Sequence, residues 1–376
     1  MIFKRQIQSE IQKKMDSGKI ILLIGPRQVG KTTLIKTLLS ESDYLFLDGD
    51  DTTVQAILET ANTEVLRNLT SNYDCVFIDE AQRIKEIALK LKIMHDQLNI
   101  QKLIVSGSSA FELNSLMQEP LTGRKWTFHL HPITWLEFEQ EVGYLKSEQV
   151  LEQVLITGLY PEILKNPSDN TDLLVELTES VLFKDVYAMS GIRKPELFIK
   201  LAKSLAWQIG QEVSYSELSG TLGLDVKTIS HYVDLLEQNY LIFQLPAFSR
   251  NHRNEIKTNK KIYFYDNGIR NALIGDFKPI SIRMDKGALW ENFLISERKK
   301  QISYSKSRAQ SYFWRTKQQQ EIDYIEEATD TLLAAEIKWS EQKRIRFSST
   351  FTSSYPAELL GVHRGNFRDF IKTPFV

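Results

Sequence analysis

The residues best suited to chemistry near the start of the chain are 25–32, which read GPRQVGKT. They fill the pattern G-x-x-x-x-G-K-[ST], whose glycines let backbone N–H groups turn toward phosphate oxygens. Lys31 is expected to reach the β- and γ-phosphates of ATP, and Thr32 to ligate Mg²⁺. The predicted ATP-binding residues are Gly25, Pro26, Arg27, Gln28, Val29, Gly30, Lys31, Thr32 and Thr33. The alternative is a glycine-containing turn with an incidental lysine.

Two acids follow the apolar run CVFI at residues 75–78. At the end of a buried strand, Asp79 would support the Mg²⁺, and Glu80 would polarise the water that attacks ATP. A third run, LIVSGSSA, ends in a polar patch where Ser106 or Ser108 could contact the γ-phosphate or the water. A plain strand end and a purely structural serine-rich turn are the alternatives.

A second group of ionisable residues lies near the C-terminus, and its members are Glu291, Asp323, Glu336 and Lys338. Residues two apart share one face of a strand, so Glu336 and Lys338 point the same way. Asp323 and Glu336 on adjacent strands could hold a divalent cation through oxygen ligands. Glu291, on a helix expected at 286–297, could add a ligand, and Lys338 would steady or activate a hydrolytic water.

Short apolar runs that alternate with helical stretches must position the predicted ATP-binding residues. Such alternation is typical of an α/β fold whose parallel sheet is covered on both faces. The expected strands are 20–24, 44–47, 75–78, 103–105 and 126–130, and the expected helices are 31–39, 53–69 and 84–98. Further helices, expected at 149–165 and 171–187, would suit a helical lid. Residues 250–376 alternate strands and helices as a small α/β unit, with a hairpin around KQQQ.

Residues 212–245 are typical of a winged-helix unit. Ser214 and Glu217 form a capping box for a short helix that stops at Gly223, and a second helix opens at Asp225. Few positive charges lie on the exposed face of the second helix, which carries Lys227, Thr228, Ser230, His231 and Asp234.

The segment SRNHRNEIKTNKK at 249–261 is more basic and could contact DNA phosphates. Its cations are Arg250, Arg253, Lys257, Lys260 and Lys261. A solvated loop, or a winged helix used for domain packing, is the alternative.

Length and composition limit the class of protein. The 376 residues suit two or three domains, at about 150 residues each. With 42% apolar and 25% charged residues the chain is an ordinary globular one, and no run approaches the ~20 apolar residues of a membrane span. The charged N-terminus lacks a signal-peptide pattern, and the single Cys75 excludes an internal disulfide, so we expect a soluble cytoplasmic protein. The net charge of −1 limits DNA contacts to local basic patches.

The motifs GPRQVGKTTL, VFIDEAQ, LIVSGSSA and LTGR resemble a bacterial and archaeal branch of AAA-type ATPases that carries a C-terminal domain of unknown function. Later segments are similar to the same family over nearly the whole chain, namely GLYPEIL, LFKDV, KIYFYDNGIRNAL, GALWENFL, YFWRT, EIDYI and EIK. The resemblance implies an ATPase core, a winged helix and a restriction-endonuclease-like domain. Together with the helical lid that the pattern suggests, we expect the core at 1–140, the lid at 141–210, the winged helix at 211–249 and the nuclease-like domain at 250–376. The resemblance also favours Arg124, in LTGR, as an arginine finger, either in cis or from a neighbouring subunit of a homo-oligomer.

The C-terminal acids resemble the PD-(D/E)XK nuclease pattern, although Ile322 rather than proline precedes Asp323. The alternative is a degenerate nuclease fold whose acids form salt bridges with Lys338 and Arg315. The preferred hypothesis is an ATP-driven switch or motor that acts on DNA through the C-terminal half. A non-enzymatic regulator controlled by ATP, and a protein-remodelling ATPase without a nucleic-acid partner, remain the alternatives.

Overall fold

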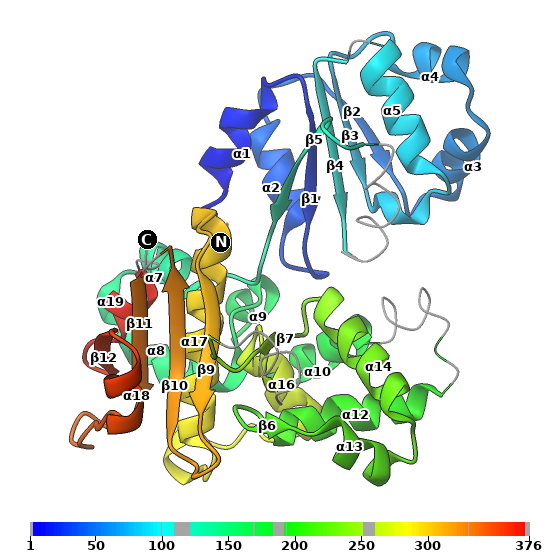
Figure 1. Ribbon diagram of the computed structural model, residues 1–376. Coiled ribbons are helices and arrows are strands. Elements are labelled where there is room, and N and C mark those ends of the chain that lie inside the picture. The colour runs from blue at the N-terminus through cyan, green and yellow to red at the C-terminus, as the bar shows by residue number, and fades with distance from the viewer. Residues whose placement is uncertain are drawn as a thin grey trace. The chain divides into compact units, whose positions relative to one another are not determined.

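The computed structural model describes residues 3–98, 100–108, 121–167, 170–182, 192, 194–250, 260–329 and 331–372. The chain divides into two compact units, Met1–Ile133 and Thr134–Val376, which we describe one at a time (Figure 1). None of the helices in the described part combines the length and the apolar character that a membrane span requires.

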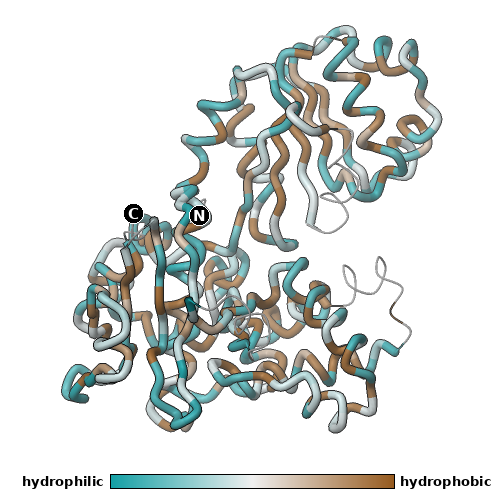
Figure 2. Tube along the Cα trace, viewed as in Figure 1, coloured by the Kyte–Doolittle hydropathy of each residue, from teal (hydrophilic) through white to brown (hydrophobic). Residues whose placement is uncertain are grey.

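The first unit is built on a parallel five-stranded sheet in the order β2-β3-β4-β1-β5. Its strands are β1 (Ile20–Ile24), β2 (Leu45–Asp48), β3 (Cys75–Asp79), β4 (Lys102–Gly107) and β5 (Lys125–His129). β1 and β3 are buried at every position, as expected for strands covered on both faces, and Figure 2 shows the hydrophobic colouring along them. The predicted α/β class with a parallel sheet is confirmed.

The helices of the first unit pack in two groups, α1 against α2, and α3 and α4 against α5. Their bounds are α1 (Gln8–Met15), α2 (Lys31–Leu38), α3 (Thr52–Thr60), α4 (Thr63–Thr70), the 3₁₀ turn η1 (Ala81–Arg83) and α5 (Ile87–Gln97). The single helix predicted at 53–69 is wrong, because Ala61 and Asn62 have extended backbones. The Asn62 side chain accepts from the Val65 amide and so caps α4.

The second unit contains two sheets and the remaining helices. The sheets have the orders β12-β11-β10-β9 and β6-β8-β7. Their strands are β6 (Glu212–Val213), β7 (Ile242–Leu245), β8 (Lys260–Phe264), β9 (Gln310–Arg315), β10 (Glu321–Ala328), β11 (Thr331–Ile337) and β12 (Glu358–Val362). β9, β10 and β11 form an antiparallel meander, with the predicted hairpin between β9 and β10, and β12 adds in parallel.

The helices of the second unit fall into two groups along the sequence, before and after β8. Those before β8 are α7 (Trp135–Val142), α8 (Tyr144–Thr157), α9 (Pro161–Lys165), α10 (Asn170–Ser180), α12 (Pro195–Trp207), α13 (Tyr215–Leu222) and α14 (Val226–Gln238). Those after it are α16 (Asn267–Ile274), the 3₁₀ turn η3 (Ile280–Ile282), α17 (Lys286–Ser305), α18 (Ser349–Ser354) and α19 (Phe367–Lys372). The helix predicted at 149–165 is interrupted at Gly158, and the prediction at 171–187 lies partly outside the described residues.

The predicted N-caps of α13 and α14 and the predicted stop at Gly223 are present, but of the predicted capping box only the bond to Ser214 is found among the described residues. Ser214 accepts from the Glu217 amide, α13 ends at Gly223 in the left-handed conformation, and Asp225 caps α14. β8 pairs antiparallel with both β6 and β7, so the helix pair α13–α14 is followed by a small antiparallel sheet that extends to Phe264.

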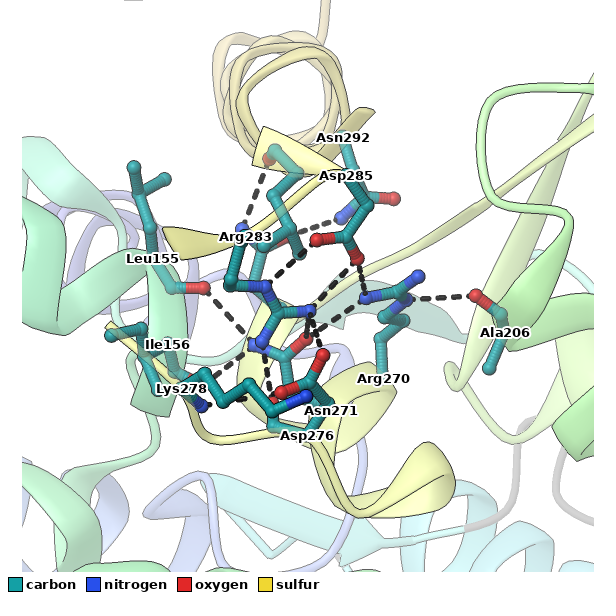
Figure 3. Close-up of polar contacts among 12 residues, drawn as sticks. Leu155, Ile156, Ala206, Arg270, Asn271, Asp276, Lys278, Arg283, Asp285 and Asn292 are labelled. Carbon is teal, nitrogen blue, oxygen red and sulfur yellow. Dashed lines mark hydrogen bonds and ion pairs between the residues drawn. The ribbon is translucent and has the colours of Figure 1, made fainter. Parts of the chain in front are cut away.

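A buried polar network fixes α16 to the loops around it (Figure 3). The Asn271 amide donates to the carbonyls of Leu155 (3.2 Å) and Ile156 (2.8 Å), at the end of α8. Arg270 Nη1 lies 2.6 Å from Asp285 Oδ2, and Arg283 donates to both oxygens of the same carboxylate over 2.8 Å. The polar residues of the motif YDNGIRN that lie in this network therefore hold the fold together.

Replacing Asp285 by asparagine is expected to reduce the free energy of unfolding by roughly 2 kcal/mol at neutral pH, because two buried guanidinium groups lose their carboxylate. Partial burial alone would raise the pKa of Asp285, but Arg283 and Arg270 lower it from 3.8 to about 2. This contribution is therefore complete well above pH 3.8 and is lost as the pH falls toward about 2. Denaturant unfolding of both proteins across that range measures it, with the exposed Asp234→Asn as control. An equal difference at pH 2 and pH 7 would contradict the ion pair.

Candidate active site

The phosphate-binding loop, residues 25–30, connects β1 to α2. Two of its positions require glycine. A Cβ on Gly25 would lie 2.0 Å from the carbonyl oxygen of Leu130, and Gly30 has a φ of 94°, in the left-handed region. The loop therefore delivers the backbone to the N-terminus of α2, where amide groups and the helix dipole favour an anion.

Lys31 is the first residue of α2 and is only 4% exposed. Its ammonium donates to the carbonyl oxygens of Gly25 (2.9 Å) and Pro26 (3.0 Å), both in the loop itself. The positive charge is thus held within the phosphate-binding loop, close to where the phosphates are expected.

Asp79, at the carboxyl end of β3, joins the helix after the loop to the neighbouring strand. The Thr32 hydroxyl donates to Asp79 Oδ2 over 2.5 Å, and the Ser106 hydroxyl donates to Oδ1. β4, which carries Ser106, lies between β1 and β3 in the sheet, so the strand order alone brings these groups together. The structure therefore unites three residues that the sequence singled out separately.

Glu80 follows in the left-handed region, with a φ of 44° that is uncommon for a residue other than glycine. Its Oε2 accepts from the Gln82 amide (2.5 Å) and from the Ser108 hydroxyl (3.3 Å). Backbone strain of this kind is found mainly at functional sites, where the surroundings hold it in place.

Arg5 is a buried support of the loop that sequence reasoning missed. Its guanidinium donates to the carbonyl oxygens of Val29 (2.7 Å) and His131 (2.6 Å), and the residue is 5% exposed. The two partners lie 24 and 126 residues away in the sequence, and no local motif announces such a contact.

Replacing Arg5 by methionine is expected to lower the free energy of unfolding of the first unit by about 2 kcal/mol, because two buried carbonyls lose a charged donor. Unfolding in denaturant, followed by a probe in the first unit, measures the change. The neighbouring Lys4→Met, at an exposed position, is the matched control. Equal stability of the two variants would contradict the supporting role.

The structure does not bring Arg124 to the phosphate-binding loop of its own chain. The Arg124 carbonyl accepts from the Ile20 amide at the start of β1, whereas the loop follows the end of that strand. Its guanidinium contacts Asp96 at 2.8 and 3.1 Å, and together with His95 it lowers the pKa of Asp96 to about 2. An arginine finger in cis is therefore incompatible with this placement, and a finger from a neighbouring subunit stays a prediction.

The residues around the loop fit a magnesium–nucleotide complex. The Thr32 hydroxyl and the Asp79 carboxylate supply oxygen atoms, the donors that Mg²⁺ prefers. Lys31 and the start of α2 supply positive charge for phosphates. The donor set and the charge therefore agree with the predicted ATP site.

Comparisons with known proteins agree with this geometry. Residues 17–139 match the family model of the AAA domain. The Walker-type ATPase PABY2304 of Pyrococcus abyssi is similar in structure, with a TM-score of 0.50 at 16% sequence identity, over 72% of this chain and 96% of that one. The first unit has the fold of a P-loop ATPase domain.

The second unit matches families whose descriptions give no activity. Residues 148–279 match a domain of unknown function (DUF8612), and residues 286–374 match another (DUF4143). The uncharacterized protein Rv2008c of Mycobacterium tuberculosis is 25% identical over 342 residues, which are 90% of this chain and 74% of that protein. An uncharacterized protein of Haemophilus influenzae is 22% identical over 73% of this chain and 74% of its own length.

The second unit contains the cluster of acids that the sequence predicted. Lys338 Nζ lies 3.1 Å from Asp323 Oδ2 and 3.0 Å from Glu336 Oε2. The backbone amide of Ile337 also donates to Asp323 Oδ2 (2.7 Å). Asp323, Glu336 and Lys338 thus share one face of β10 and the end of β11.

Glu291, on α17, has different partners. It accepts from the Tyr263 hydroxyl over 2.6 Å, and Lys261 Nζ lies 3.4 Å away. Lys261 also contacts Glu321 and is 2% exposed. Sequence reasoning had placed Lys261 in a basic surface segment, so this buried cation beside the acids was missed.

Burial and the nearby Asp323 carboxylate raise the pKa of Glu336 from 4.5 to about 7, despite the Lys338 ammonium. Burial also raises the pKa of Glu291, against the charge of Lys261. Glu336 is therefore partly protonated near neutral pH.

Within the ranges that the structure describes, no three His, Cys, Asp or Glu side chains are arranged to hold a metal ion. Lys338 bridges Asp323 and Glu336 instead. Arg315 pairs with Glu212 (3.2 Å) and lies 3.9 Å from Glu321. The salt-bridge alternative thus describes Lys338 well, while metal binding by Glu291, Asp323 and Glu336 stays a prediction.

The predicted DNA-contacting surface is only partly described. Arg253 and Lys257 lie outside the described residues. Lys260 donates to the Gln244 side chain (3.0 Å), and Lys261 is buried against acids. On α14, Ile229, Val233 and Leu236 are buried as predicted, whereas the exposed Lys227 is offset by the exposed Asp234.

Proposed function

We propose that the chain is an ATP-driven switch or motor, in which the ATPase domain binds and hydrolyses ATP and thereby controls the second unit. The observation that carries the proposal is the pair of hydrogen bonds from Thr32 and Ser106 to Asp79. These bonds connect the start of α2, the acidic end of β3 and the neighbouring strand β4 in one polar site.

In the proposed reaction, Lys31 exchanges the carbonyls of its own loop for the β- and γ-phosphate oxygens. Glu80 takes a proton from a water as the water oxygen bonds to the γ-phosphorus. The bond between that phosphorus and the oxygen that stays with ADP breaks, and the proton leaves with the products. When bound, Mg²⁺ would neutralise charge on the phosphates. Thr32 and Asp79 would hold the ion, and the hydrogen bond from Ser106 would keep Asp79 in place.

Release of inorganic phosphate from ATP by the full chain tests this function. Saturable, Mg²⁺-dependent release is expected. ATP binding without release would instead favour the regulator that ATP controls without hydrolysis. In this proposal Arg124 acts only as an arginine finger from a neighbouring subunit, which requires a homo-oligomer. We place this homo-oligomer in the cytoplasm.

For the second unit we propose DNA binding by a winged helix, formed by α13, α14 and the β6-β8-β7 sheet, next to a nuclease-like domain. Support for a nuclease-like site comes from the contacts of Lys338 with Asp323 and Glu336. In a metal-dependent nuclease, acids on adjacent strands hold the cation and a lysine steadies the water. The acids would have to exchange their lysine contacts for the metal.

Cleavage of DNA in the presence of Mg²⁺ or Mn²⁺ is expected to be lost in Asp323→Ala, because Asp323 is central to the cluster. The exposed Asp43→Ala, outside the second unit, is the control, and both variants are assayed with and without ATP. Equal cleavage by Asp323→Ala and the parent would assign the activity to another site or a contaminant. Salt-dependent, ATP-responsive DNA binding without cleavage would favour the regulator, and no DNA affinity even at low salt would favour a protein-remodelling ATPase.

A further inference from the structure

Gln82 lies in the short turn η1, two residues after the acid proposed to polarise the water. The residue is 8% exposed, so its amide group is almost fully removed from solvent. Its nitrogen donates to Glu80 Oε2 (2.5 Å) and to the Ser108 hydroxyl (3.0 Å). Gln82 therefore already contacts two of the residues that the sequence placed near the γ-phosphate.

The orientation of this amide follows from its partners. A carboxylate accepts hydrogen bonds and does not donate them, so the nitrogen of Gln82 must face Glu80. The amide oxygen, Oε1, is then left buried without a hydrogen-bond partner in the part of the chain that the structure describes. An unsatisfied buried acceptor destabilises the folded state, and native proteins rarely tolerate one without a functional reason.

The amide lies near the carboxyl ends of the strands, at the end of the sheet that carries the phosphate-binding loop. Ser108 directly follows β4, whose last residue, Gly107, accepts a hydrogen bond from the amide of Gly25 (3.3 Å). Gly25 is the first residue of the loop. The Glu80, Gln82 and Ser108 side chains therefore belong to the same end of the sheet as Lys31 and Thr32.

We propose that Gln82 Oε1 accepts a hydrogen bond from the water that attacks the γ-phosphorus, which makes Gln82 a catalytic residue beside Glu80. The inference rests on the proposed hydrolysis of ATP. A water has two hydrogens, and Glu80 and Gln82 offer one acceptor for each. When both are engaged, a lone pair of the water oxygen is left to face the phosphorus.

This arrangement also explains why an amide suits position 82. Its nitrogen stabilises the ionised carboxylate of Glu80 by a charge-assisted hydrogen bond. Its oxygen positions the water without competing for the proton. A second carboxylate at this position would repel the first and leave both less able to ionise.

The test compares ATP turnover and binding of a non-hydrolysable ATP analogue in Gln82→Leu, Gln82→Glu and the parent. Gln97→Leu, at an exposed position on α5, is the matched control. Gln82→Leu is expected to lower kcat by ~10- to 100-fold, with KM and analogue affinity within about twofold of the parent. The contacts that it loses are to the water, Glu80 and Ser108, and none of them is to the nucleotide. Gln82→Glu keeps the shape and is expected to shift the acidic limb of the pH–rate profile to higher pH.

Parental kcat in Gln82→Leu would overturn the inference and leave the ATPase function standing. A parallel loss of kcat and analogue affinity would show that Gln82 only supports the fold of the site, and this result also overturns the inference. If Gln82→Leu does not fold, an unshifted pH–rate profile in Gln82→Glu overturns it. A parent that binds the analogue but releases no phosphate contradicts the proposed function itself, and the inference fails with it.

Discussion

Replacing Lys31 by alanine is expected to lower ATP affinity and ATP turnover together, each by about 100-fold or more. Lys31 is buried at the start of α2, and its ammonium already lies within hydrogen-bond distance of the loop carbonyls at Gly25 and Pro26. In this loop pattern the lysine is the side chain that reaches both the β- and γ-phosphates. Loss of a preorganised charged donor from a water-poor site has effects of this size.

Titration with a fluorescent ATP analogue and a phosphate-release assay measure the two effects of Lys31→Ala. The exposed Lys85→Ala, which lies outside the loop, is the control for loss of a lysine. Parental affinity in Lys31→Ala would mean that the nucleotide binds elsewhere.

Replacing Glu80 by glutamine is expected to reduce turnover by ~10²- to 10⁴-fold while ATP still binds. The amide has nearly the same shape as the carboxylate but cannot take a proton from water. Lys31, Thr32 and Asp79, which would hold the nucleotide, stay unchanged. The variant should therefore accumulate bound ATP.

Single-turnover kinetics with quantification of bound ATP and ADP distinguish this outcome from a binding defect. The exposed Glu64→Gln is the control for loss of one negative charge. Turnover at the parental rate in Glu80→Gln would exclude Glu80 as the proton acceptor.

Sequence pattern predicts the ATPase domain well because its signals are local. A parallel sheet covered on both faces needs short, continuously apolar strands, and β1 and β3 show that pattern. The requirement for glycine at Gly25 and Gly30 follows from close backbone approach and a left-handed φ. The position of Asp79 at the end of β3 was predictable because the acid directly follows an apolar run.

The missed residues act through contacts that the sequence does not record. Arg5 reaches the carbonyls of Val29 and His131, and Lys261 reaches acids on α17 and β10. A lysine among basic neighbours is typical of solvated surface, so only the pairing of β8 with β6 and β7 could reveal its burial. For Arg124, the motif left open a role in cis or from a neighbouring subunit, and its place directly before β5, beside the start of β1, leaves the role from a neighbouring subunit as the prediction.

The polar motif around α16 shows a further limit of sequence reasoning. The segment YDNGIRN is rich in groups that could bind a ligand. In the structure, Asn271 and Arg270 donate hydrogen bonds to carbonyls of α8 and α12 and to the Asp285 carboxylate. A dense polar motif can therefore stabilise a fold. Only the hydrogen-bond partners in the structure distinguish this role from ligand binding or catalysis.

The most direct test of the central claim is phosphate release from ATP, measured on the full chain in the presence of Mg²⁺ beside Lys31→Ala and Glu80→Gln. The proposed ATPase function predicts saturable release by the parent, loss of binding in the first variant, and binding without release in the second. Equal release by the parent and both variants would contradict the assignment of ATP hydrolysis to this site.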